Sequence, residues 1–255
     1  PGEQNLPVFG RAAVFLKSGV LGPHALHREH AELLGRFLQN RISADQDLQR
    51  LAIVVPDSMS ELARRALRQT LGPCWAVWQT VAVALAYAAE APADTTDGED
   101  VEERRILVIA ASAASCDLAV LGWTGREAEG RLLIRRPHLS VSLPGIESLL
   151  VDGFPIAERE ALRSAWLRAP HDTQLWVERP AEPSSFRRQS VPDVCPALSK
   201  QLAPALAKLM KRAGPIDVMV MAGLPDAVAK DVERSLPDIP RVTLGESAAV
   251  VGARQ

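Results

Sequence analysis

The sequence predicts an α/β protein built of two lobes. Short apolar runs typical of buried strands alternate along the chain with segments of helical periodicity, a pattern that favours mixed α/β structure. The chain has 255 residues, of which 47% are hydrophobic and 24% charged, enough for one large domain or two lobes. The acidic, turn-rich segment 91–103 interrupts the pattern and marks the expected boundary between the lobes.

The part before this boundary is expected to hold two strands, each followed by a helix. Pro56 ends the first strand, and Asp57 or Ser58 can cap the helix that follows. Apolar side chains recur at helical spacing on one side of each helix. Strands are expected at 51–55 and 75–78, and helices at 24–41, from about 57 to 71 and at 80–90.

The part beyond the boundary is expected to contain more strands, interleaved with helices. Pro204 lies inside a long helical pattern, where we expect it to bend or break the helix. Strands are expected at 105–110, 117–122, 131–136, 174–178 and 216–223, and helices at 144–153, 157–168, 192–212, 225–235 and 246–253.

The charge balance argues against nucleic acid or a membrane as a partner. There are 29 Lys and Arg against 31 Asp and Glu, a formal charge of -2, and the Arg pairs such as Arg64-Arg65 and Arg187-Arg188 are interleaved with acids. No apolar run reaches the ~18 to 20 residues that span a bilayer. The opening PGEQNLPVFG has no signal-peptide pattern, so a cytoplasmic protein is expected.

Side chains with metal or redox chemistry form no recognisable site. His24, His27 and His30 are three residues apart, so on a helix they do not converge on one ion, and no metal is expected. The three cysteines are widely spaced and odd in number, which favours free, reduced thiols. The common hydrolase, zinc-protease and nucleotide-loop motifs do not occur in the chain.

The stretch 106–121, ILVIAASAASCDLAVL, predicts two strands joined by a tight turn. Turns of this shape often hold phosphate, because glycines let successive N–H groups converge on an anion. This turn contains Ala and Ser in place of glycine. The glycines that such a phosphate-binding turn uses are therefore missing here.

Five stretches, in order, resemble the nucleotide-binding domain of the DnaK (heat-shock protein 70) family of chaperones. The predicted hairpin at 106–121 resembles that family's DLGGGT region, and WQTVAVALAY at 78–87 resembles its NEPTAAALAY. The five stretches are 53–67, 78–87, 106–121, 167–178, and 217–236 with 246–253.

This resemblance implies the two-lobed actin-like ATPase fold, which is ribonuclease H-like, with an incomplete first lobe. Residues 1–100 with 245–255 would be the remnant of the first lobe, and 101–244 would be the second lobe. Nothing in 1–50 resembles the family's first phosphate loop, and no peptide-binding domain is expected.

The resemblance implies a degenerate nucleotide pocket, in which the residues that hold the metal, the phosphates and the adenine have been replaced. Its metal-holding acid would be Ala110 and its catalytic Glu would be Gln79, and neither side chain can act as a base or carry the charge. The phosphate glycines would be Ser112, Ala113 and Ala114, followed by Ser115; the adenine side would be Ala161, Ser164, Arg168, Ala222 and Gly223. Of the family's acids in this region, the one that follows the turn is still present, as Asp117.

The expected function is therefore a catalytically inactive DnaK-like domain that binds protein partners or takes part in assembly. No cofactor is expected, and ATP or ADP binding is not expected. Two alternatives stay open: a divergent ATPase that uses Asp117 and Ser115, and an actin-like filament subunit. Trp166 and Trp176 are candidates for an exposed binding surface.

Overall fold

The computed structural model describes most of the chain beyond residue 51 and four residues before it. The described residues are 32, 35, 36, 39, 52–72, 74–90, 104–112, 115–126, 132–135, 139–152, 154–155, 158–159, 161–162, 165–166, 174–179, 182–191, 193–245 and 248–253.

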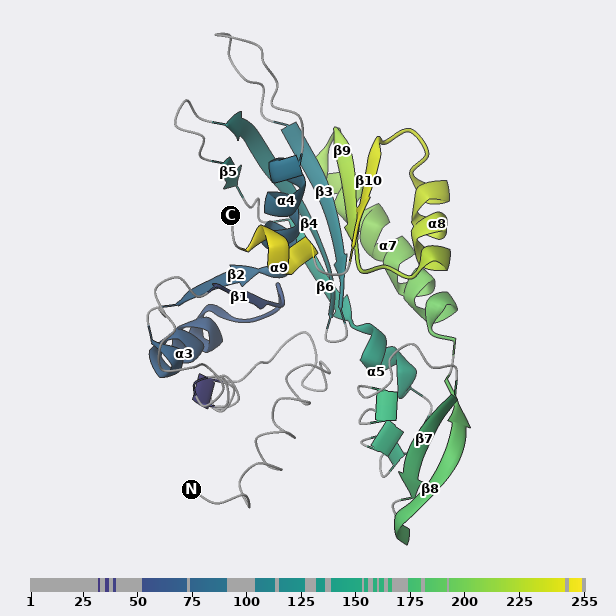
Figure 1. Ribbon diagram of the computed structural model, residues 1–255. Coiled ribbons are helices and arrows are strands. Elements are labelled where there is room, and N and C mark those ends of the chain that lie inside the picture. Colours follow the sequence, from purple (N-terminus) through teal and green to yellow (C-terminus); the bar gives the residue numbers. More distant parts are fainter. Residues whose placement is uncertain are drawn as a thin grey trace.

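A mixed six-stranded sheet forms the centre of the molecule (Figure 1). Its strand order is β10-β9-β3-β4-β5, and β6 also pairs with β4. The pairs β3/β4, β4/β5 and β4/β6 are antiparallel, whereas β3/β9 and β9/β10 are parallel. The strands are β3 (Arg104–Ala111), β4 (Ser115–Arg126), β5 (Leu132–Arg135), β6 (Ser140–Pro144), β9 (Val218–Ala222) and β10 (Arg241–Leu244).

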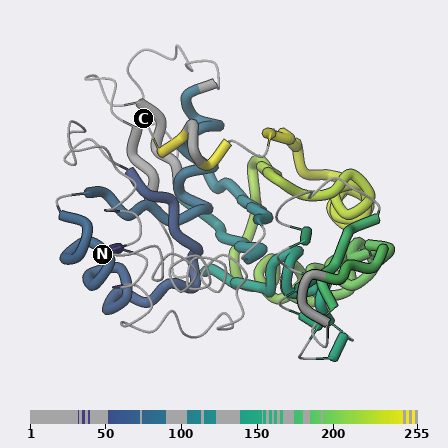
Figure 2. Tube along the Cα trace, turned by 60° about the horizontal axis from the view of Figure 1, so that its bottom comes forward, coloured from purple at the N-terminus to yellow at the C-terminus, as the bar shows by residue number. Residues whose placement is uncertain are grey.

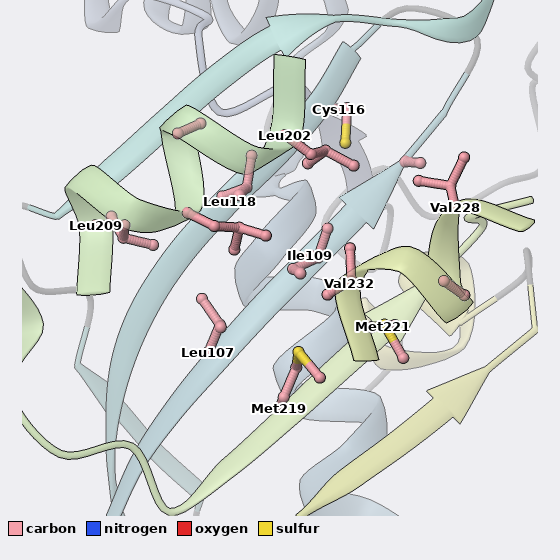
Figure 3. Close-up of a cluster of buried hydrophobic side chains, with 14 of the residues drawn as sticks. Leu107, Ile109, Cys116, Leu118, Leu202, Leu209, Met219, Met221, Val228 and Val232 are labelled. Carbon is pink, nitrogen blue, oxygen red and sulfur yellow. The ribbon is translucent and has the colours of Figure 1, made fainter. Parts of the chain in front are cut away.

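Both faces of this sheet are buried, so its central strands are apolar on both sides, as expected for strands between helices. Helices α7 (Cys195–Ala213) and α8 (Asp226–Ser235) cover one face, and α4 (Gln79–Glu90) with α9 (Ala248–Gly252) cover the other (Figure 1). Within β3, Leu107 and Ile109 point toward α7 and α8 (Figure 3), whereas the alternate residues Ile106 and Val108 point toward α4.

Small residues let α4 and α9 cross closely on the second face. A Cβ built at Gly252 of α9 would lie 1.7 Å from the carbonyl oxygen of Ala82 and 2.7 Å from the backbone nitrogen of Ala86. Both alanines are buried in α4. Residues 79–90 and 248–252 thus share a core with the six-stranded sheet, and their assignment to a separate first lobe stays a prediction.

A smaller unit precedes α4. Strands β1 (Ala52–Val55) and β2 (Trp75–Trp78) pair in parallel, and α3 (Glu61–Leu71) connects them and packs on them. The hydroxyl of Ser60 accepts a hydrogen bond from the N–H of Ala63 and caps α3. Ser60, and not Asp57 or Ser58, is therefore the cap, and the helix begins later than the sequence predicts.

A hairpin forms the opposite end of the molecule (Figure 2). Strands β7 (Gln174–Arg179) and β8 (Glu182–Ser190) pair antiparallel, and the inward side chains Leu175 and Val177 pack with residues from α5 (Ile146–Leu150) and the helical segment around Leu162. Trp176 lies on the outward face of β7 and is 60% exposed.

The predicted strands and most of the helices predicted within the described residues are confirmed, and three strands were not predicted. The loop predicted at 91–103 and all but four residues of the helix predicted at 24–41 lie outside the described residues. Helix α7 runs without a break from Cys195 to Ala213, so Pro204 does not break it; the alternative prediction, a bend at Pro204, stays a prediction. Where a helix was predicted at 144–153, a strand ends at Pro144 and a short helix ends at Leu150. The missed strands are β6, β8 and β10.

Cys74, Cys116 and Cys195 are free thiols, as predicted. Among the helices that the structure describes, none combines the length and the apolar character needed to cross a bilayer.

Candidate functional site

A row of four residues crosses the sheet on the face that α4 covers. Ala222 of β9 pairs with Ala110 of β3, Ala110 pairs with Asp117 of β4, and Asp117 pairs with Ser142 of β6. Because paired residues of neighbouring strands share a face, all four side chains project toward the same side. Three of them, Ala222, Ala110 and Ser142, are neutral, so Asp117 brings the row's only carboxylate.

Asp117 is fully buried and accepts three hydrogen bonds from three parts of the chain. The hydroxyl of Ser142 donates to Oδ1 at 2.5 Å, and the hydroxyl of Ser115 donates to Oδ2 at 2.8 Å. The backbone N–H of Asp57, in the loop after β1, donates to Oδ2 at 3.0 Å. These bonds offset the desolvation of the carboxylate and tie the β1 loop to the sheet.

Asp57 in turn connects this cluster to the start of α4. Its Oδ2 accepts the Thr80 hydroxyl at 2.6 Å, and its Oδ1 accepts the backbone N–H of Thr80 at 3.2 Å. A carboxylate at a helix N-terminus satisfies an N–H that has no partner within the helix, and it interacts favourably with the helix dipole. Asp57 therefore caps α4 from a distant loop, although the sequence suggested it as a cap for α3.

The protonation of Asp117 reflects two opposing influences. Burial and the neighbouring charge of Asp57 raise its pKa to about 6, while the hydrogen bonds from Ser142, the Asp57 backbone and Ser115 act in the opposite direction. A carboxyl with this pKa changes its charge near neutral pH. The cluster of Asp57, Thr80, Ser115, Asp117 and Ser142, here called the carboxylate cluster, is thus both a structural joint and a titratable site.

The turn between β3 and β4 is closed by its own hydrogen bonds. The N–H of Ser112 donates to the carbonyl of Ser115 at 2.8 Å, and the N–H of Ser115 donates to Oγ of Ser112 at 3.2 Å. The Ser112 hydroxyl also donates to the Ser115 carbonyl at 3.0 Å. These two N–H groups are therefore used inside the turn, so they do not point toward an external anion.

Several of the residues selected from the sequence are near one another. Ala110, Ala222 and the turn residue Ser115 belong to the row or to the carboxylate cluster, and Gln79 is a buried residue directly before Thr80. Gly223 follows β9 with φ of 67°, and a Cβ there would lie 2.3 Å from the carbonyl oxygen of Ala111. The turn after β9 thus packs directly on the β3–β4 hairpin.

The remaining selected residues do not join this group. Ala161 is partly buried and packs in the separate apolar cluster of Leu150, Leu162 and the β7–β8 hairpin. Ala113, Ala114, Ser164 and Arg168 lie outside the described residues, as do His24, His27 and His30.

Sequence reasoning missed Asp57, Thr80 and Ser142 as members of the site. The available signal was Asp117 itself, a charged residue inside an otherwise apolar strand, because a buried charge requires hydrogen-bond partners. Which partners it finds depends on contacts between residues up to 60 positions apart.

The chemistry that the site supports is limited by its composition. Within the described part of the chain, no three His, Cys, Asp or Glu side chains come together in a group that could hold a metal ion. The carboxylates of Asp57 and Asp117 already accept hydrogen bonds from protein donors.

Neither a protein-family model nor a curated protein matches this sequence.

Proposed function

We propose that this chain is a DnaK-like domain that has lost ATP hydrolysis and acts as a protein-binding or assembly component. The proposal takes its family from the order of the five resembling stretches. The observation that best supports the proposed loss of activity is the pair of hydrogen bonds that close the turn between Ser112 and Ser115.

Phosphoryl transfer needs backbone donors around the phosphates and a metal ion held close to them. In this turn, the N–H of Ser115 donates to the Ser112 side chain, and the N–H of Ser112 donates back across the turn. A phosphate bound by these two N–H groups would have to displace both bonds. The geometry therefore supports a hairpin that is stable without a ligand.

The two positions to which the resemblance gives charged side chains hold neutral residues, Ala110 and Gln79, and this supports the same conclusion. Ala110 is fully buried and lies opposite Asp117 in the sheet, so its methyl group occupies the place that the resemblance gives to a metal-holding acid. Gln79 stands where the resemblance gives a catalytic Glu, and it is 7% exposed. A neutral amide cannot act as a general base.

One observation favours a second candidate, a divergent nucleotide-binding domain. Asp117 keeps a carboxylate in the row, and Ser115 keeps a hydroxyl 2.8 Å from it. A carboxyl with a pKa of about 6 is ionised in most molecules at pH 7, so it could attract a divalent cation that accompanies a nucleotide. We rank this candidate second because the bonds from Asp57, Ser115 and Ser142 already occupy that carboxylate.

The experiment that separates the two candidates is thermal unfolding with millimolar ATP, with and without Mg²⁺. A ligand at a hundred times its dissociation constant adds about 2.7 kcal/mol to the free energy of unfolding, which raises the Tm by several degrees. We expect no Mg²⁺-dependent shift. A reproducible shift that disappears in the Asp117→Asn variant would establish the second candidate and overturn the first.

A further inference from the structure

Helix α7 carries positive charge and no negative charge. Its 19 residues include Lys200, Lys208, Lys211 and Arg212 but no Asp or Glu. All four of these side chains are exposed, and none of them takes part in the ion pairs found among the described residues. The two cations in the last turn also complement the helix dipole, but Lys200 lies near the other end of the helix, where the dipole does not favour it.

A groove of about 300 Å³ lies between α7 and α8, beside this positive charge. The two helices lie next to each other on one face of the sheet (Figure 1). Leu202 and Leu206 of α7 and Val232 of α8 supply its apolar lining. Ser199 and Asp231 supply polar lining and are joined by a hydrogen bond of 2.7 Å.

Helical spacing puts part of the positive charge next to the groove. Lys200, Ala203, Ala207 and Lys211 are separated by three, four and four residues, so they form one exposed ridge along α7. Ala203 belongs both to this ridge and to the groove lining. At about 100° per residue, Lys200 and Lys211 lie about 60° to 80° around the helix from Ala203, whereas Lys208 and Arg212 lie about 140° to 180° away.

We propose that the α7–α8 groove binds an acidic amphipathic helix of a partner protein. The apolar side chains of that helix would enter the groove over Leu202, Leu206 and Val232, and its carboxylates would pair with Lys200 and Lys211. These two lysines are eleven residues apart, about 16 Å along the helix axis, so carboxylates three turns apart on a helix running beside α7 match them. This proposal rests on the protein-binding role proposed above.

The size and charge of the groove favour this occupant over a small ligand. Sites for small molecules usually measure about 300 to 1,000 Å³ and enclose most of their ligand. This groove is at the lower limit, and the charge of Asp231 is already paired with Arg234. The unmatched charge is the positive ridge, so the complementary partner has an apolar stripe bordered by acids.

The test uses the full chain and a synthetic, fluorescently labelled peptide with Leu at i, i+3 and i+7 and Glu at most other positions. Fluorescence anisotropy at physiological salt measures its dissociation constant. The double variant Lys200→Glu with Lys211→Glu should weaken binding about tenfold or more, because two attractions become repulsions. Ala203→Trp should weaken it to a similar degree by filling the groove.

Two matched variants and one altered peptide serve as controls. Lys208→Glu with Arg212→Glu makes the same charge change at residues that lie farther around α7 from Ala203, so it should weaken binding several-fold less than the Lys200 and Lys211 variant does. Ala197→Trp adds the same side chain at an exposed position outside the groove. A scrambled peptide of equal charge but without the apolar stripe should bind at least tenfold more weakly.

Three results would overturn the proposal. The first is that the amphipathic peptide does not bind. The second is that both charge variants weaken it equally. The third is that the scrambled peptide, or a single-stranded RNA, binds as well as the amphipathic peptide, which would mean that α7 attracts polyanions in general. None of these results affects the ATP unfolding experiment, so the proposed loss of nucleotide binding is tested separately.

Discussion

The backbone N–H of Asp57 lies 3.0 Å from Oδ2 of Asp117, across 60 residues of sequence. This bond joins the loop after β1 to the centre of the six-stranded sheet. The Asp57 carboxylate meanwhile holds the N-terminus of α4 through Thr80. One pair of acids therefore fixes the positions of β1, α4 and β4 relative to one another.

The first prediction concerns the pH dependence of this joint. The pKa of Asp117 is about 6 in the folded protein against an ordinary value of 3.8. Between these two values the folded state binds more protons than the unfolded state, so this residue makes the protein less stable as the pH rises through the window. Each unit of pKa difference corresponds to about 1.4 kcal/mol.

Asp117→Asn removes this titration while keeping the size of the side chain. Urea unfolding from pH 4 to pH 7 should therefore show that the wild-type protein loses stability relative to the variant as the pH rises, with most of the change below about pH 6. Parallel stability curves for the two proteins would contradict the assignment of the titration to Asp117. Serine variants of exposed carboxylates, such as Asp226→Ser, provide the background slope.

The second prediction concerns rebuilding the turn. Under the function proposed above, changing Ala110 to Asp, and Ser112, Ala113 and Ala114 to Gly, should not produce ATP hydrolysis, because the neutral amide of Gln79 cannot act as a base. The variant should also be less stable. Each glycine costs about 0.5 to 1 kcal/mol, Ser112→Gly removes the hydroxyl that closes the turn, and Asp at position 110 would lie opposite Asp117 in the register.

The matched control carries the three glycines but keeps Ala110. It separates the flexibility of the turn from the repulsion between two buried carboxylates, and we expect it to unfold at a higher urea concentration than the fourfold variant. ATP turnover by the fourfold variant above that of the control, measured as phosphate release, would show that the pocket is more complete than we propose.

The third prediction compares two glycines. Gly223 has φ of 67°, and a Cβ there would lie 2.3 Å from the Ala111 carbonyl oxygen, so Gly223→Ala combines an unfavourable backbone conformation with a clash. We expect a loss of about 2 to 4 kcal/mol in the free energy of unfolding. A Cβ at Gly245 meets nothing within 4 Å, so Gly245→Ala should change it by less than about 1 kcal/mol. Equal effects at the two positions would contradict this packing.

The parts of the fold that the sequence predicts well are those with a strong local pattern. Two uninterrupted apolar runs, 106–109 and 218–221, are long enough to predict buried strands. Both runs lie in strands of the central sheet, β3 and β9. The outward residues of β8 are polar or charged apart from Phe186, and β10 has four residues with alternating exposure. Their strand structure depends on pairing with β7 and β9, which local composition does not reveal.

For the candidate site too, the sequence predicts the residues that share a local pattern and misses those that tertiary packing brings in. Ala110, Ser115 and Asp117 lie in one continuous stretch, so the sequence alone could select them. Asp57 and Ser142 reach Asp117 only because a loop and a neighbouring strand are brought to it by tertiary packing. The misassigned cap illustrates the limit: Asp57 has the side chain of a helix cap, but the helix it caps begins 22 residues later, at Gln79.

The last prediction separates two tryptophans that the sequence treats alike. Trp166 is partly buried and packs against the apolar cluster that includes Leu162 and Leu175, so Trp166→Ala should reduce the free energy of unfolding by about 2 kcal/mol or more. Trp176 is 60% exposed, and its ring lies 5.7 Å from the Arg188 guanidinium carbon across the hairpin. Trp176→Ala loses that contact and some strand propensity, together about 1 kcal/mol or less. Urea unfolding of both variants, with circular dichroism to confirm that each is folded, measures the difference; a larger loss for Trp176→Ala would mean that the hairpin's outer face is covered in solution.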